Sequence, residues 1–250
     1  MRSWFRQGTH RSPRCVVHAI AALTGFTAAS AAAKPPVEPA PIEATPRSIP
    51  IHSSYQTWLA FTATGPVIEP LLTFVDIIGG FQPDMAPAAF VVRPALGVRL
   101  PLGFSVFAGY SYASIWNDVL ERTEEHTAFQ QVGYLAPLGG VHLFGRVRGE
   151  ERFRPDSEVG YRLRLLMQLN VPLWRRAPLD AVIAEELFLG LNQPASWQPD
   201  LLDQDQYYFG VGWTVDPHFR ADLGYQGAIA PRTDEIAVAH CLSISATAGW

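Results

Sequence analysis

Hydrophobic and polar side chains alternate along most of the chain from residue 54 onward, with a period of two residues. In "GRVRGEERF", residues 145–153, an arginine or glutamate occupies every second position from Arg146 to Arg152. The stretch "YRLRLLM", residues 161–167, begins with the same alternation. Successive side chains of a β-strand point to opposite faces, so a period of two indicates strands. Each of these strands is predicted to have one charged and one apolar face.

Eleven segments of this kind follow one another, and almost no helical periodicity interrupts them. Several exceed the roughly 5–6 residues of a common globular strand and suit the roughly 9–11 that a tilted membrane strand needs. Tight connections such as "LPLG" alternate with long polar ones such as "NQPASWQPDLLDQ", as in outer-membrane barrels. The predicted strands span residues 54–64, 70–79, 88–100, 102–114, 121–136, 140–153, 157–172, 179–191, 203–216, 218–229 and 235–250.

The count of eleven conflicts with the even number of strands found in single-chain bacterial barrels. A barrel of ten strands would result if one of the first two segments lay outside the wall. A barrel of twelve would result if residues 40–52 supplied another strand. We expect an all-β, up-and-down antiparallel transmembrane barrel, and twelve strands are favoured over ten.

Two environments fit strands with one charged and one apolar face. A soluble lipocalin-like barrel would hide its apolar face inside and could bind an apolar ligand. A membrane barrel would turn that face to lipid and its charges to a wet lumen. The mean hydropathy of +0.06 is high for a soluble protein, and only the N-terminus has a run long enough for a helical span. Composition therefore favours the membrane barrel.

The charged face of a membrane barrel would line its lumen. Rings of arginine favour anions, so one interpretation is a selectivity lining or an anion site. A cross-strand network that fills a narrow barrel is the alternative, and it is favoured because neighbouring strands bring opposite charges into contact. The predicted lumen residues are Glu125, Arg146, Arg148, Glu150, Arg152, Arg162, Arg164, Glu186, Gln206, Arg220 and Asp222, and the same face holds Arg93 and Arg99.

The ends of the chain suggest export. Basic residues, an apolar stretch and the small residues "ASAAA" predict a cleaved secretory signal over residues 1–33, in preference to a membrane anchor. The Pro-rich residues 34–52 are expected to form a periplasmic tether, and residues 53–250 the barrel. The terminal Trp250 closes an alternating strand and resembles an outer-membrane assembly signal; we expect it in the periplasm. The predicted partners are outer-membrane lipid and the assembly machinery.

Chemistry-bearing motifs are few. A net charge of −4 without a basic run gives no reason to expect nucleic-acid binding. The mature chain would keep only Cys241, and we expect no disulfide, metal or cofactor. Histidines at 126, 142 and 240 and serines at 243 and 245 raise the alternative of a barrel enzyme acting on lipid A or phospholipid. Residues 240 and 243 have opposite parity, however, so a non-enzymatic narrow channel or wall component is favoured.

Six motifs resemble a known family. The chain is similar, over residues 54–250, to the outer-membrane proteins of domain-of-unknown-function family 2490. The resemblance implies a barrel in the outer membrane and no particular chemistry. Thr127 stands where the family has Arg, and Asp205-Gln206 stand where it has Asn-Arg, so not every lumen contact is expected to be kept. The motifs are "EEHTAFQQ", "GRVRGEERF", "YRLRLLM", "AEELFLGL", "DQDQYYFGVGW" and "DLGYQ".

Overall fold

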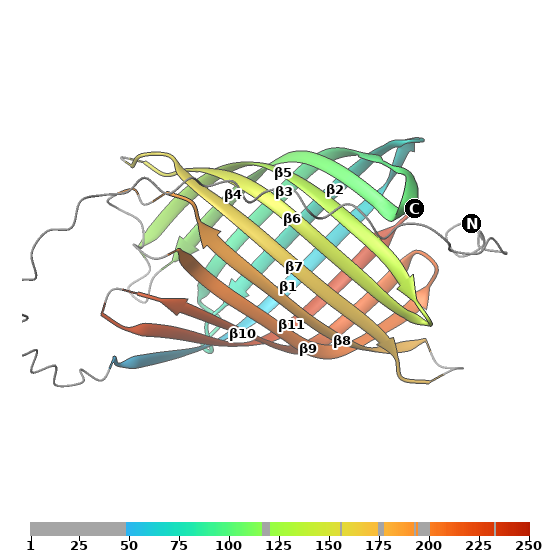
Figure 1. Cartoon of the computed structure of the whole chain (residues 1–250). Coiled ribbons are helices and arrows are strands. Elements are labelled where there is room, and N and C mark those ends of the chain that lie inside the picture. Colours follow the sequence, from blue (N-terminus) through green and yellow to red (C-terminus); the bar gives the residue numbers. More distant parts are fainter. Residues whose placement is uncertain are drawn as a thin grey trace, which may run out of the picture. The chain divides into compact units, whose positions relative to one another are not determined.

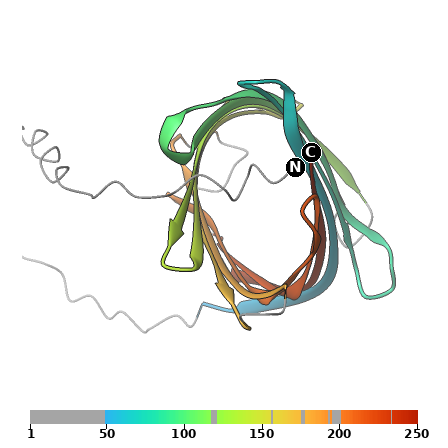
Figure 2. The same ribbon diagram turned by 90° about the vertical axis from the view of Figure 1, so that its right-hand side faces the viewer.

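Eleven strands form a closed β-barrel in the computed structural model of the chain (Figure 1). The structure describes residues 49–116, 121–155, 157–174, 178–192, 194, 201–232 and 234–250. The predicted signal peptide and most of the predicted tether lie outside these residues. Figure 2 looks along the barrel and shows the strands closing into a ring.

The strands follow the alternating segments closely, and a short 3-10 turn, Pro101–Gly103, precedes the fourth. Their bounds are β1 Ile51–Ile68, β2 Leu71–Phe81, β3 Pro87–Arg99, β4 Phe104–Trp116, β5 Arg122–Leu138, β6 Val141–Phe153, β7 Gly160–Pro172, β8 Leu179–Gly190, β9 Leu202–Asp216, β10 Phe219–Pro231 and β11 Ile236–Gly249.

The predicted count of twelve strands, or ten, is wrong. Both of the first two segments lie in the wall, and β1 already begins at Ile51, within the range assigned to the tether. Consecutive strands pair antiparallel, so in an odd-numbered barrel the first and last strands run in the same direction. The barrel closes because β1 and β11 pair in parallel, in one unbroken register from Ile51↔Ile236 to Thr64↔Gly249.

The connections divide between two ends of the barrel. We call the turn end the one that holds the connections at residues 69–70, 100–103, 139–140, 173–178 and 217–218. The loop end is the other one, where β2 ends and β3 begins, and likewise β4 and β5, β6 and β7, β8 and β9, and β10 and β11. Because the strand number is odd, β1 starts at the loop end, whereas Trp250 lies at the turn end.

The hairpin between β5 and β6 shows how the sequence sets a tight turn. Its two connecting residues, Gly139 and Gly140, have φ values of 61° and 102°. A Cβ atom makes this left-handed region costly, and glycine has none, so glycine suits both positions. Two residues with positive φ match the twist of the flanking strands and allow a two-residue hairpin.

Charged and polar side chains occupy the inner face of the barrel, and large apolar side chains occupy the outer face. In β5, Glu125 and Gln131 are buried, whereas Val132 is 44% exposed. Leu223 and Leu242, on β10 and β11, are each more than half exposed. This arrangement is the reverse of a lipocalin-like barrel, which keeps its apolar face inside.

A small apolar cluster also lies inside, on the β2–β5 side. It consists of Leu72, Ala95, Phe107 and Phe129, with Phe74 packed against them. Phe74 and Phe107 lie with their ring centroids 5.9 Å apart. The interior is therefore not uniformly polar, and its aromatic part adjoins the charged part at Phe129.

The parallel seam generates a cross-linking prediction. In a Cys241→Ala background, Leu59→Cys and Ile244→Cys face outward on paired positions of β1 and β11. Adjacent partners fall within the Cα separation that a disulfide tolerates. We expect mild oxidation to consume both thiols, as measured by the mass of the purified protein.

The matched control is Leu59→Cys with Ser243→Cys, because Ser243 lies one position away and is buried on the inner face. This pair is expected to keep both thiols free. Equal cross-linking of the two pairs, or no cross-linking of either, would contradict the parallel register.

Candidate functional site

A continuous series of ion pairs runs through the barrel interior, and we call it the ionic chain. It begins near the loop end and crosses from β5 and β6 to β8 and β9. Its order is Arg154, Glu125, Arg152, Asp203, Arg162, Glu150, Arg164, Glu186 and Arg146.

The ion pairs are short and most are buried. Arg152 donates from Nε and Nη2 to the two oxygens of Glu125, at 2.9 and 2.8 Å. Arg162 joins Glu150 at 2.6 Å and Asp203 at 3.1 Å. Paired donor forks of this kind are the strong form of a charge-assisted hydrogen bond. Alternating charge along the chain therefore compensates each buried ion with a neighbour of opposite sign.

Strand register explains why these side chains meet. Arg148 of β6 lies opposite Gln131 of β5 and opposite Arg164 of β7, which in turn lies opposite Phe188 of β8. Two arginines directly across a sheet repel each other. Glu150, two positions along β6, contacts both guanidinium groups and offsets that repulsion.

Arg164 is the best-compensated cation of the interior. Its Nε and Nη2 donate to Glu186 at 2.9 and 2.8 Å, and its Nη1 donates to Glu150 at 3.1 Å. The guanidinium carbon lies 4.2 Å from the ring centroid of Phe188, which adds a cation–π contact. Arg164 is thus held by two carboxylates and one aromatic face.

Arg148 is fully buried, with 0% of its surface exposed. Its Nε and Nη2 donate to Oε1 of Gln131 at 2.9 and 2.6 Å, and its guanidinium lies 4.5 Å from the centroid of Phe129. Its Nη1 is 3.8 Å from Glu150 and makes no hydrogen bond. Arg148 therefore joins the ionic part of the interior to the apolar cluster.

Arg93 extends the network across the barrel. It pairs with Asp76 of β2 at 2.6 Å, and it interacts electrostatically with Glu150, Arg146 and Arg164. Strand β3 adjoins only β2 and β4, so these interactions cross the interior rather than follow the sheet. The charges of the ionic chain therefore act on Arg93 across the interior.

The ionic chain and its neighbours carry a surplus of positive charge. The ionic chain together with Arg93, Arg148 and Asp76 contains seven arginines and five carboxylates, a surplus of 7 − 5 = 2. An ion that passed through would meet a positive potential where the lumen is most crowded.

A second, separate cluster lies near the turn end. Arg220 donates to Asp180 at 2.6 Å and to Asp222 at 2.9 Å. A Cβ at Gly212 would lie 1.8 Å from Nη2 of Arg220, so this glycine makes room for the guanidinium. Arg220 and Asp222, predicted to line the lumen, therefore belong to a different group from the ionic chain.

Two other predicted interior residues also stand apart. Gln206 lies opposite Glu186 in the register of β8 and β9, but among the described residues its side chain accepts a hydrogen bond from Gln226, at 3.5 Å, and makes none to the ionic chain. Arg99 pairs with Glu69 beside the turn end. The remaining predicted residues, from Glu125 to Glu186, come together as one network.

Several members of the network were not predicted. Asp203 has the parity of the outer face, but the register of β8 and β9 shifts between Phe188 and Leu189. This bulge leaves Asp203 as an extra residue that reaches Arg152 and Arg162. Strict alternation cannot reveal a bulge. Arg154, just past β6, continues the inward parity of that strand and could have been found from it.

The residues that could suggest enzyme chemistry are separated. His240 stacks on Tyr55 with ring centroids 5.2 Å apart and contacts the hydroxyl of Tyr225 through Nδ1 at 2.6 Å. Tyr55 is 65% exposed, so this group lies on the outer face, whereas Ser243 is buried on the inner one. His126 likewise contacts the hydroxyl of Tyr110.

Two further kinds of feature are absent from the described part of the chain. No group of three or more His, Cys, Asp or Glu residues there is arranged to hold a metal ion. No helix among the same residues is long and apolar enough to cross a membrane. Cys241 is a buried free thiol.

Trp250 is anchored to the first strand. Its indole Nε1 donates to the carbonyl oxygen of Pro66 at 3.1 Å. A Cβ at Gly65 would lie 2.5 Å from the indole ring, so only glycine leaves space for this contact. The C-terminus therefore adds a side-chain contact to the seam between β1 and β11.

Comparison with known proteins identifies one family. The family described as "Protein of unknown function (DUF2490)" matches residues 55–238, which is most of the barrel. No curated protein and no solved structure matches the chain.

The network generates a stability prediction. Glu150→Gln removes the negative charge that Arg148, Arg162 and Arg164 share, which leaves buried Arg148 without a carboxylate and leaves Arg162 and Arg164 with one each. We expect the free energy of unfolding to fall by about 3–5 kcal/mol. Denaturant titration followed by tryptophan fluorescence would measure it.

The matched control is Glu151→Gln, the neighbouring glutamate, which is exposed on the outer face. It should change the free energy of unfolding by no more than about 0.5 kcal/mol. Similar effects from the two substitutions would show that buried pairing does not stabilise the barrel.

Proposed function

Because the chain belongs to the DUF2490 family, for which no chemistry is known, we propose its function from the geometry of the barrel. The protein is a non-enzymatic β-barrel of the bacterial outer membrane. Its interior is closed by the ionic chain and the apolar cluster, so it acts as a component of the membrane wall rather than as an open pore.

The outer surface supports a membrane location. Phe209, Val211 and Trp213 follow one another on the outer face of β9 and are each about half exposed, at 53%, 45% and 52%. Soluble monomers rarely expose large contiguous apolar patches. Every strand has at least 11 residues, enough for the roughly 9–11 that a tilted membrane strand needs.

The interior supports closure. Arg93 of β3 lies within electrostatic range of the ionic chain, and Arg148 packs on Phe129 of the apolar cluster. Removing any one ion from such a network leaves its partner uncompensated in a poorly solvated place. The network is therefore expected to hold its arrangement, and a mobile ion would have to displace it.

Short turns of outer-membrane barrels face the periplasm and long loops face outward. We therefore place the turn end, with Trp250, in the periplasm. The parallel seam then puts the start of β1 on the outer side. The sequence prediction placed both the tether and Trp250 in the periplasm, whereas the orientation proposed here puts the start of β1 and Trp250 at opposite ends of the barrel.

Epitope tags would test this orientation. A tag inserted after Ala44 should be labelled by antibody on intact cells. A tag between Gly139 and Gly140, in the turn end, should be labelled only after the outer membrane is permeabilised. The reverse pattern would contradict the orientation, and equal labelling of both tags in a soluble periplasmic fraction would contradict the membrane location.

Planar-bilayer recordings would test closure. The full-length mature protein should show current close to baseline. The double variant Glu150→Ala/Arg164→Ala removes two large interior side chains of opposite sign and keeps the net charge. It should show stable conductance steps, because the narrowest level of the interior is widened.

The control is Glu185→Ala, which removes a carboxylate from the exposed outer face of β8. It should behave as the unmodified protein does. Stable open-pore conductance of the unmodified protein, with a preference for anions, would instead establish a narrow channel and overturn the closed-barrel proposal.

A further inference from the structure

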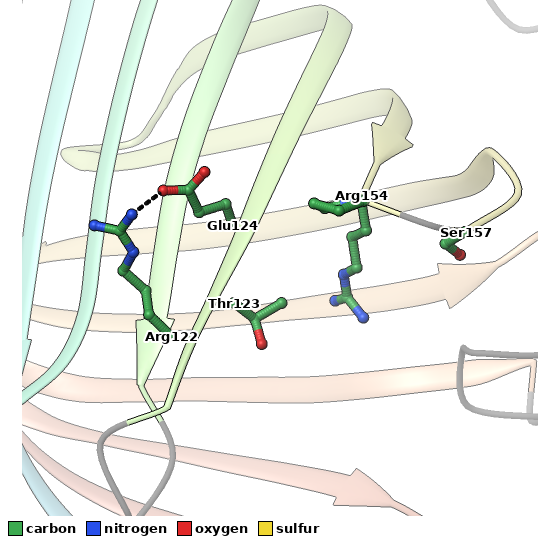
Figure 3. Close-up of a pocket in the computed structure, with 6 residues that line it drawn as sticks. Arg122, Thr123, Glu124, Arg154 and Ser157 are labelled. Atoms are coloured by element: carbon green, nitrogen blue, oxygen red, sulfur yellow. Dashed lines mark ion pairs between the residues drawn. The ribbon is translucent and has the colours of Figure 1, made fainter.

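A polar pocket lies at the loop end, where β5 begins and β6 has just ended. Its volume is about 530 Å³, within the range of small-molecule sites. Figure 3 shows Arg122 and Glu124 of β5 on one side and Arg154 and Ser157 on the other. The lining consists of Arg122, Thr123, Glu124, Arg154, Pro155 and Ser157.

Two arginines dominate the chemistry of this pocket. Arg122 pairs with Glu124 at 2.5 Å, and Arg154 pairs with Glu125 at 2.8 Å. A guanidinium has five N–H donors, so it can bind a protein carboxylate and a ligand oxygen at the same time. Each pair also positions its arginine on the pocket wall.

The lining points to a phosphate-bearing ligand. Guanidinium groups match phosphate oxygens with paired hydrogen bonds, and hydroxyls such as those of Thr123 and Ser157 can add single ones. The pocket is far larger than one phosphate, and Glu124 offers acceptors suited to ligand hydroxyls. Only Pro155 is apolar, so a hydrophobic ligand would leave the charged walls without partners.

We propose that this rim pocket binds a phosphorylated sugar, with Arg154 contacting the phosphate on the inner side of β5 and with Arg122 and Glu124, on its outer side, contacting sugar hydroxyls. The same chemistry occurs in a soluble sugar phosphate and in the phosphorylated sugar headgroup of an outer-leaflet lipid. The site goes beyond the function proposed above and does not depend on whether the barrel is closed.

Binding at this site would reach the ionic chain. Glu125 is shared by Arg154 in the pocket and by Arg152 further inside, with both contacts at 2.8 Å. A phosphate held by Arg154 would lie beside Glu125 on the same guanidinium, so its negative charge would repel that carboxylate. The rim pocket is therefore coupled to the first link of the interior network.

Isothermal titration of the full-length mature protein with glucose 1-phosphate would test the site, with glucose and inorganic phosphate as probes of its two halves. Glucose 1-phosphate should bind best and glucose worst. Arg122→Gln and Arg154→Gln should each weaken binding by roughly tenfold or more, because a hydrogen bond to a charged group is lost.

The matched control is Arg232→Gln. Arg232 is also an exposed arginine of the loop end, paired with Glu235 at 3.4 Å, and it lies outside the pocket. Because Arg232 does not line the pocket, this variant should bind glucose 1-phosphate within about twofold of the unmodified protein. Binding unaffected by the two pocket variants, or absent altogether with every probe, would overturn the proposal.

Vesicles would identify the source of the ligand. Co-sedimentation with vesicles that contain lipid A, compared with enzymatically dephosphorylated lipid A, reports on a lipid headgroup. Loss of the phosphate-dependent part of binding in Arg154→Gln would assign the site to the lipid. If the protein binds glucose 1-phosphate but binds vesicles with lipid A and with dephosphorylated lipid A equally well, the site is assigned to a soluble sugar phosphate. The folded state of each variant is checked by its denaturant midpoint.

Discussion

Buried guanidinium groups need partners, and this requirement organises the whole barrel. Arg148 has no exposed surface and Arg164 has almost none, so water cannot compensate their charge. Glu150 of β6 and Glu186 of β8 supply the opposite charge from the two strands that flank Arg164 on β7. These contacts form only when β5 to β8 stand in one register, because a slip by one residue would turn every charge to the outer face. Charge pairing inside and apolar side chains outside are therefore two results of one register.

Closure imposes a second constraint. An up-and-down barrel with an odd number of strands has only one way to close, through a parallel pair. Parallel pairing is slightly weaker per residue than antiparallel pairing. Here the seam is long, and Trp250 reinforces it through Pro66 and the space above Gly65. The same geometry separates the start of β1 from the C-terminus, so the two ends of the barrel are chemically different.

The interior and the rim form one electrostatic system. Glu125 links the polar pocket at the loop end to Arg152, and the chain then continues to Arg146 near the centre. Arg93 of β3 lies within electrostatic range of this chain. The barrel therefore has a polar pocket that faces solvent at one end and paired charges in its interior. This arrangement agrees with the two proposals, a barrel closed to ions and a ligand site at its rim.

The alternation of residues by itself determined the strands, their two faces and most of the ionic chain. A period of two is a local property, so Arg146, Arg148, Glu150 and Arg152 had to share a face wherever the strand was placed. Other features depended on contacts between distant segments. The number of strands required β1 to meet β11, and Asp203 turned inward only through a bulge against β8. Arg93 came within electrostatic range of the ionic chain only because the sheet curves back on itself. Pairing partners and barrel closure are properties of the folded sheet, and no single segment contains them.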